Sequence, residues 1–118
     1  FEIYVQDMAR AHRFYEAVLR KKLEKLGDPN DGSLQMMAFP MDMALPGASG
    51  ALVQMPGVPS GGNSTLVYFS CDDCSDEAGR VVSSGGRIQR DKMSIGQYGY
   101  ITLAFDTEGN LFGLHSMK

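Results

Sequence analysis

The sequence predicts an α+β fold built from two tandem β-α-β-β-β modules. The main observation is an internal repeat between residues 3–16 (IYVQDMARAHRFYE) and residues 69–82 (FSCDDCSDEAGRVV). Each segment leaves a β-rich run, passes an Asp and enters an amphipathic helix, and Asp7 matches Asp73. Because the unit occurs twice and each copy accounts for about half of the chain, the repeat indicates two copies of one supersecondary module rather than a solenoid.

A second observation is the stretch rich in Gly and Pro between the two copies, at residues 56–64 (PGVPSGGNS). Such residues are typical of a linker, because they break regular structure. We therefore expect a single domain over residues 1–118. Module one lies at about residues 1–57, the linker at about 58–64, and module two at about 65–118.

Module one is predicted to open with a strand over residues 2–5. Asp7 is a suitable N-cap for the helix that follows, which is expected to run to about Arg20. Apolar residues recur at helical spacing along one face of this helix: Met8, Ala11, Tyr15 and Val18. Turn residues at 27–33 (GDPNDGS) lead into further strands, at 34–40 and 51–55, which are joined through Leu45-Pro46-Gly47.

Module two repeats this plan. A strand is expected over residues 65–71, followed by a helix that is capped by Asp72 or Asp73 and runs to about Ser83. Gly85-Gly86 then supplies the stop signal of that helix. The remaining segments are strands at 87–90 and 98–105, a turn at 106–110 (DTEGN), and a last strand at 111–115.

The composition excludes several classes of protein. The formal net charge is −3 and the sequence pI is about 5.2, and the basic residues cluster only in Arg20-Lys21-Lys22. Nothing here builds the basic face that binding to phosphates requires, so we expect no nucleic-acid partner. The sequence has neither an apolar stretch long enough to span a bilayer nor a signal-peptide pattern, so we expect no membrane partner and a cytoplasmic location.

Cys71 and Cys74 form a C-x-x-C motif where a strand passes into a helix, which is the position of a thioredoxin-like redox pair. The alternative is structural: Cys71 is a buried strand residue, and Cys74 lies on the inner face of the helix with Ala78 and Val81. The second interpretation is favoured, because the motif is short and no second pair completes a zinc site.

Three segments together are similar to a known family. Val5-Gln6-Asp7 with Arg13-Phe14-Tyr15 is similar to a V-x-D…F-Y opening, and residues 106–110 are similar to a D-P-x-G-N turn, with Thr107 where Pro is usual. Ser84-Gly85-Gly86 is similar to a helix-ending Gly-Gly. These motifs resemble the vicinal oxygen chelate superfamily, which includes glyoxalase I, extradiol dioxygenases, bleomycin-binding proteins and fosfomycin-resistance enzymes. The resemblance implies a curved, cup-like mixed sheet with the helices outside, and commonly a homodimer.

The same resemblance bears on metal binding. Metal-dependent members take His, Gln or Glu ligands from the first and last strands of each module, and these leave open positions on the metal for substrate oxygens. The matching positions here hold Leu66, Gly113 and, at about the same place in module one, Gln54, while the fourth falls just before Phe1. Because Leu66 has no donor atom and Gly113 has no side chain, we expect no family-type metal and no cofactor.

Strand alternation singles out candidate site residues. Glu2 and Tyr4 share one face of the first strand, and Ile3 and Val5 share the face that the helix covers. Glu2 and His115 are the candidate catalytic residues, because a carboxylate or an imidazole on an interior face can act as acid or base. The candidate ligand-binding residues are Tyr4, Gln54, Tyr68, Tyr98 and Tyr100. For each there is a plainer alternative: a solvated charge, an edge histidine, or packing.

The favoured function is metal-free binding of a small molecule, in the manner of bleomycin-resistance proteins. The cavity would be apolar and aromatic, with Glu2, Gln54 and His115 at its edge and methionines in its lining. One alternative is a lyase or isomerase, similar to lactoylglutathione lyase, that uses Glu2 or His115 as acid or base, or a metal at other ligands. Another is an interaction domain that binds no ligand.

Overall fold

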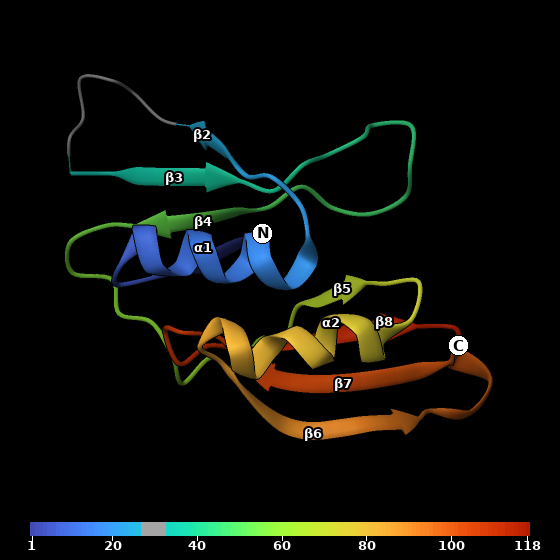
Figure 1. Ribbon diagram of the computed structural model, residues 1–118. Coiled ribbons are helices and arrows are strands. Elements are labelled where there is room, and N and C mark those ends of the chain that lie inside the picture. The colour runs from blue at the N-terminus through green and yellow to red at the C-terminus, as the bar shows by residue number, and fades with distance from the viewer. Residues whose placement is uncertain (27–32) are drawn as a thin grey trace.

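The computed structural model describes residues 1–26 and 33–118, and this part of the chain forms two four-stranded sheets. Figure 1 shows the first sheet in the upper part of the view and the second in the lower part. The first has the strand order β1-β4-β3-β2 and the second the order β5-β8-β7-β6. The predicted α+β fold with two tandem modules is confirmed, because each sheet follows the chain order β-α-β-β-β.

The first module begins with β1 (Glu2–Tyr4), which is parallel to β4 (Ala51–Gln54). Between them in the sequence lie α1 (Met8–Leu19), β2 (Glu24–Leu26) and β3 (Gln35–Ala38). Helix α1 begins where expected, because the Asp7 side chain accepts a hydrogen bond from the Arg10 N–H. Strand β2 is an exposed edge strand that the sequence did not reveal, because its residues do not alternate. The predicted turn at 27–33 lies outside the described residues except for Ser33.

The second module has the same order, and its first strand β5 (Tyr68–Ser70) is parallel to β8 (Leu111–Ser116). Helix α2 (Cys74–Val81) is capped by Asp73 and continues into the short 3₁₀ helix η1 (Val82–Ser84). Strand β6 (Arg87–Ser94) runs further than predicted, and β7 (Tyr100–Phe105) begins later. A second 3₁₀ helix, η2 (Gly96–Tyr98), separates them, so Tyr98 lies in a turn rather than in a strand.

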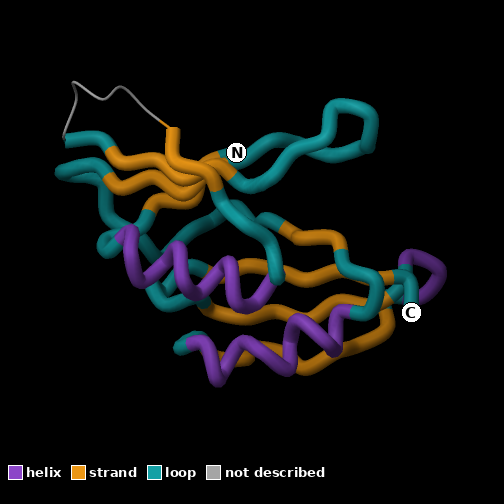
Figure 2. Tube along the Cα trace, turned by 45° about the horizontal axis from the view of Figure 1, so that its top comes forward, coloured by secondary structure: helices purple, strands orange, loops and turns teal. Residues whose placement is uncertain are grey.

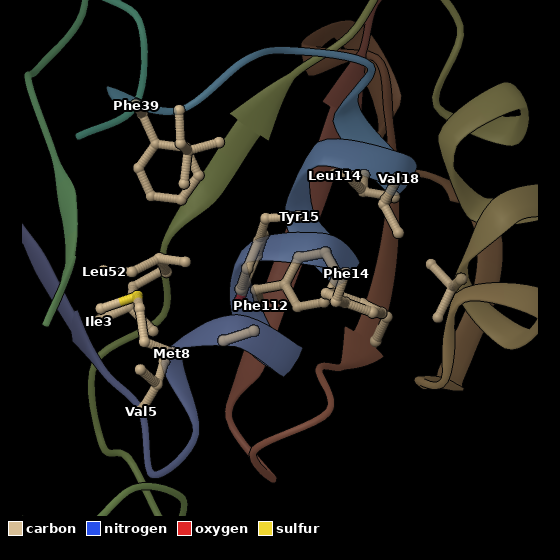
Figure 3. Close-up of a cluster of buried hydrophobic side chains, with 14 of the residues drawn as sticks. Ile3, Val5, Met8, Phe14, Tyr15, Val18, Phe39, Leu52, Phe112 and Leu114 are labelled. Carbon is tan, nitrogen blue, oxygen red and sulfur yellow. The ribbon is translucent and has the colours of Figure 1, made fainter. Parts of the chain in front are cut away.

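The two modules share one hydrophobic core. Figure 2 shows the two helices running side by side along the sheets, and α1 is in contact with α2. Six aromatic rings interlock at the core and around its edge, with centroid separations of 5.0–6.1 Å: Phe1, Phe14, Tyr15, Phe39, Phe69 and Phe112. In Figure 3, Phe14 and Tyr15 of α1 lie beside Phe112 of β8. The aromatic rings therefore join the modules without a shared sheet.

A buried carboxylate joins the modules at one end of this core. Glu108, in the turn before β8, accepts hydrogen bonds from the backbone N–H groups of Gln6 and Asp7, both at 3.0 Å. It also receives two from the Arg10 guanidinium, at 2.7 and 2.9 Å. Burial acts to raise the pKa of Glu108, but these donors and the Thr107 hydroxyl outweigh it and lower the pKa to about 2.

Two neighbours of Glu108 complete this junction. The Tyr15 hydroxyl donates to Asp106 at 2.6 Å, and Asn110 donates to the Tyr4 carbonyl at 2.9 Å. Burial raises the pKa of Asp106, although the hydrogen bonds from Tyr15 and Asn110 oppose it. Protonation of Asp106 therefore stabilises the folded state, whereas protonation of Glu108 destabilises it.

We expect Glu108→Gln to lower the free energy of unfolding at pH 7 by about 3 kcal/mol, because it leaves buried donors without a charged acceptor. The folded-state pKa of about 2 lies below the ordinary value of 4.5, so this stabilisation is complete above pH 4.5 and is lost as the pH falls toward 2. Urea unfolding between pH 2.5 and pH 7 should show the variant and the native chain converging in acid. Asp91→Asn, at an exposed carboxylate, is the control. An equal difference at every pH would contradict the expectation.

Candidate functional site

The alternation predicted for the first strand is present in β1. Ile3 and Val5 are buried in the core on the helix side, and the side chains of Glu2 and Tyr4 lie on the other face. The Tyr4 hydroxyl donates a hydrogen bond to Glu2 Oε1 at 2.7 Å. That bond, with a smaller effect of burial, raises the pKa of Tyr4, so the hydroxyl remains protonated and Glu2 keeps its second oxygen for another donor.

Glu2 and Tyr4 line a cavity of about 390 Å³ between β1, the segment before β5, and the start of β8. Its wall is mostly apolar, and the described lining residues that are neither Glu2 nor Tyr4 are Phe1, Ile3, Tyr15, Pro59, Gly61, Asn63, Thr65, Val67, Asn110, Leu111 and Phe112. Asn110 holds the segment before β5 in place, because its Oδ1 accepts a hydrogen bond from the Gly61 N–H at 2.7 Å. We call this the β1 cavity.

A second cavity, of about 410 Å³, lies on one face of the second sheet, and we call it the β8 cavity. It is lined by Tyr68, Ser70, Ile95, Ile101 and His115. The register brings these side chains to one face, because Ser70 and Ile101 are both direct neighbours of His115 across the sheet. His115 Nε2 lies 2.6 Å from the Tyr98 carbonyl oxygen, which accepts a hydrogen bond from Nε2–H.

The predicted site residues are therefore divided between two places. Glu2 and Tyr4 lie in the β1 cavity, whereas Tyr68 and His115 lie in the β8 cavity, and the two linings have no described residue in common. Within one chain, Glu2 and His115 line separate cavities, and Gln54 is not among the described residues that line either of them. Tyr98 has an exposed side chain, and only its backbone carbonyl contacts His115.

Gln54 does not lie on the cavity face. Its Oε1 accepts a hydrogen bond from the Met8 N–H, at the first residue of α1, at 2.7 Å. In the second module the Ser116 hydroxyl accepts from the Cys74 N–H, at the first residue of α2, at 3.0 Å. The two side chains occupy equivalent positions and satisfy helix N–H groups that lack a partner within the helix. This placement favours a structural role for Gln54.

Tyr100 also lies on the helix side of its sheet. It packs against the core, as do its alternate neighbours in β7, Thr102 and Ala104, which are buried. Lys92 Nζ lies 4.8 Å from the centre of the Tyr100 ring and donates to the helix cap Asp73 at 2.8 Å. Strand β7 turns Ile101, and not Tyr100, toward the β8 cavity.

The two cysteines are free thiols. Cys74 is buried and accepts from the Thr102 hydroxyl, while Cys71 is half-buried. Burial, followed by a hydrogen bond with Glu77, raises the pKa of Cys71 well above its ordinary range. A redox-active pair needs a thiol whose pKa is lowered, so the structure favours the structural interpretation.

The family of the chain follows from comparison with known proteins. A family model described as the Glyoxalase/Bleomycin resistance protein/Dioxygenase superfamily matches residues 1–114. The chain belongs to this superfamily. A comparison with curated proteins gives no match. Among the helices of residues 1–26 and 33–118, none has the length and apolar character needed to cross a membrane.

Solved structures of superfamily members have the same fold. Glyoxalase I from Zea mays superposes with a TM-score of 0.76 at 21% identity, over 98% of this chain and 44% of that one. The trypanothione-dependent glyoxalase I of Leishmania major has a TM-score of 0.74 at 16% identity, over 99% and 84%. A domain from Frankia sp. EAN1pec gives 0.71 at 13%, over 100% and 94%. These identities show the fold alone, and the chain spans less than half of the maize enzyme.

The residues at the superfamily's metal positions do not fit a metal. Leu66 offers no donor, and a Cβ placed on Gly113 would overlap the ring of Tyr68. The register also moves the matching position in the first module from Gln54 to Ala51, because Ala51 lies opposite Glu2 as Gly113 lies opposite Tyr68. Across the described residues, no three His, Cys, Asp or Glu side chains gather closely enough to hold an ion.

Several residues that line the cavities are not among the candidates predicted from the sequence. Ile101 could have been predicted from strand alternation. Its neighbour Thr102 is buried, so Ile101 lies on the opposite face of β7, beside His115. The positions of Ile95 and of the segment around Gly61 could not have been predicted in this way, because both belong to irregular backbone. No periodicity indicates which way such residues point.

Proposed function

We propose that this chain binds a small molecule without a family-type metal ion, in the manner of the bleomycin-resistance members of the superfamily. The observation that carries the proposal is the pair of mostly apolar cavities, each with several polar side chains in its wall. That combination is typical of ligand sites, where the apolar wall supplies affinity and the polar groups set orientation. Leu66 and Gly113 at the metal positions support the metal-free part of the proposal.

Glu2 supplies the polar end of the β1 cavity. Of the described residues that line this cavity, it is the one with a charged side chain, and Tyr4 satisfies one of its oxygens. A carboxylate beside an apolar wall favours a ligand with a cationic or hydrogen-bond-donating head and an apolar body. Tyr4 holds the carboxylate in orientation, so less freedom is lost when the ligand binds.

A second candidate function is a lyase or isomerase with His115 as acid or base, and the contact with Tyr98 favours it. A carbonyl accepts but cannot donate, so the hydrogen bond at 2.6 Å places the proton on Nε2. In the neutral ring, Nδ1 is then the nitrogen that takes up a proton. Turnover of a bound compound, lost in His115→Gln while binding persists, would favour this function over simple binding.

We also propose a homodimer in which a partner module covers each cavity. No residue of α1 or α2 is among the described residues that line the β8 cavity, and Tyr68 and Tyr98 have exposed rings. Exposed apolar surface next to a site is typical of an interface. A two-fold axis that pairs the modules would wall each cavity on its open side.

The metal-free proposal predicts that protein purified without chelators contains well under one equivalent of zinc, nickel, iron or manganese. Elemental analysis by mass spectrometry measures this directly. As a control, the same preparation is dialysed against each ion before analysis. A stoichiometric metal whose removal abolishes ligand binding would overturn the proposal.

The role of Glu2 predicts a dependence on head-group charge. Phenethylamine should raise the melting temperature of the chain, whereas 3-phenylpropionate, with a similar ring and the opposite charge, should not. Glu2→Gln should weaken phenethylamine binding about tenfold in calorimetry with folding nearly unchanged, because the amide removes the charge without opening a cavity. Glu24→Gln, at an exposed carboxylate on β2, is the matched control. Unchanged affinity in Glu2→Gln would remove Glu2 from the site.

The proposed assembly predicts a dimer at micromolar concentration in sedimentation equilibrium. Tyr68→Asp, which places a charge on the exposed face, should shift the mass toward the monomer. If the native chain sediments as a monomer throughout the micromolar range, the proposed dimer is wrong.

A further inference from the structure

We propose that the Tyr68 ring, seated on Gly113, is a stacking plate for a neutral, planar aromatic ligand in the β8 cavity, with His115 as acceptor for a hydroxyl or N–H on that ligand. This inference rests on the proposed small-molecule binding and names the ligand class of one cavity. It differs from the role of Glu2, which concerns the β1 cavity and a cationic head.

The first argument is the fit between Tyr68 and Gly113. The two residues are direct partners across the parallel pair β5–β8, so their side chains would point to the same face. Gly113 has none, and the Tyr68 ring takes that space: a Cβ on Gly113 would meet ring atoms Cγ, Cδ1 and Cε1. The ring therefore packs on the backbone of β8, and its orientation is fixed before any ligand arrives. A fixed ring loses little freedom on binding.

The second argument is that the ring remains accessible. Tyr68 is 45% exposed, although its ring packs against a buried glycine. It lines the β8 cavity together with Ile95 and Ile101, which provide the apolar walls. The volume of about 410 Å³ lies in the range of small-molecule sites. Aromatic rings pair by offset stacking or edge-to-face contact, and a preset plate favours a flat partner over a puckered one.

The third argument concerns charge. None of the described residues lining the β8 cavity is Asp, Glu, Lys or Arg, so an ionised ligand would lose its hydration without a counter-charge. The polar groups are the Ser70 hydroxyl, the Tyr68 hydroxyl and the His115 ring. Because Nε2–H of His115 donates a hydrogen bond to the Tyr98 carbonyl, Nδ1 is left as the acceptor of the neutral ring. A neutral aromatic with one hydroxyl or N–H donor matches this set.

The test uses the full chain and naphthalen-2-ol as the probe. Its own fluorescence reports binding clearly, since the chain contains no Trp. The control compound is decahydronaphthalen-2-ol, which has the same carbon skeleton and hydroxyl but is not planar, and calorimetry measures both. We expect the planar compound to bind about threefold to tenfold more tightly. Equal affinities, or no binding of naphthalen-2-ol, would overturn the inference.

Variants then locate the plate. Gly113→Ala should displace the ring and weaken naphthalen-2-ol binding about tenfold, and Tyr68→Ala should do the same without crowding the strand. Tyr68→Phe keeps the ring and should bind like the native chain. His115→Phe should weaken naphthalen-2-ol but not naphthalene. Val82→Ala, at an exposed site on η1, is the control. Unchanged binding in Tyr68→Ala contradicts the stacking role, whether or not Gly113→Ala folds.

The outcomes also separate this inference from the proposed function. One outcome is that phenethylamine binding depends on Glu2 while naphthalen-2-ol and decahydronaphthalen-2-ol bind equally well. That outcome overturns the stacking plate and leaves the proposed function standing. Absence of binding by every probe overturns both. Binding of naphthalen-2-ol that depends on Tyr68 supports both, since it is itself small-molecule binding.

Discussion

The buried carboxylate of Glu108 is the interaction on which the arrangement of the two modules depends. Its donors come from the corner between β1 and α1, while Glu108 itself belongs to the turn between β7 and β8. A buried charge keeps its place only while it is fully hydrogen-bonded, so the two corners are held at one distance and one angle. The Ser60 hydroxyl, which donates to the Glu108 carbonyl at 2.9 Å, brings the connecting segment to the same point. The edge of β1, and with it Glu2, is therefore placed against that segment.

The aromatic core explains why the modules join without a common sheet. Phe39 from the first module and Phe69 from the second have ring centres 5.2 Å apart, and Tyr15 contacts both. Rings of this size fill the space between two twisted sheets and leave each sheet with one uncovered face. The β8 cavity lies on such a face, whereas the β1 cavity is lined in part by Tyr15 and Phe112 of this core, so Glu2 and His115 lie in separate cavities within one chain.

Relative to the metal-dependent plan of its superfamily, this chain has an aromatic ring in place of a metal ligand at the β8 cavity. A glutamate-type ligand in the last strand would project into the space now taken by the Tyr68 ring, and the glycine at 113 is what makes that space available. An aromatic surface and a metal centre bind different kinds of ligand. The aromatic surface binds flat apolar groups, whereas the metal centre polarises oxygen atoms of its ligand. The exchange is consistent with the proposed binding role.

The sequence by itself determined the local features. The cap at Asp7, a cap at Asp72 or Asp73, the alternation that separates Glu2 from Ile3, the tandem modules, and the lack of donors at Leu66 and Gly113 all depend on residue type and short-range periodicity. Only the tertiary structure decided which distant residues meet. Gln54 caps α1, Tyr100 faces Lys92, Glu108 receives donors from residues about a hundred positions away, and Ile95 enters a cavity from an irregular turn. The physical reason is that alternation fixes the face of a strand residue, whereas the partner on that face depends on packing between modules, which no local pattern encodes.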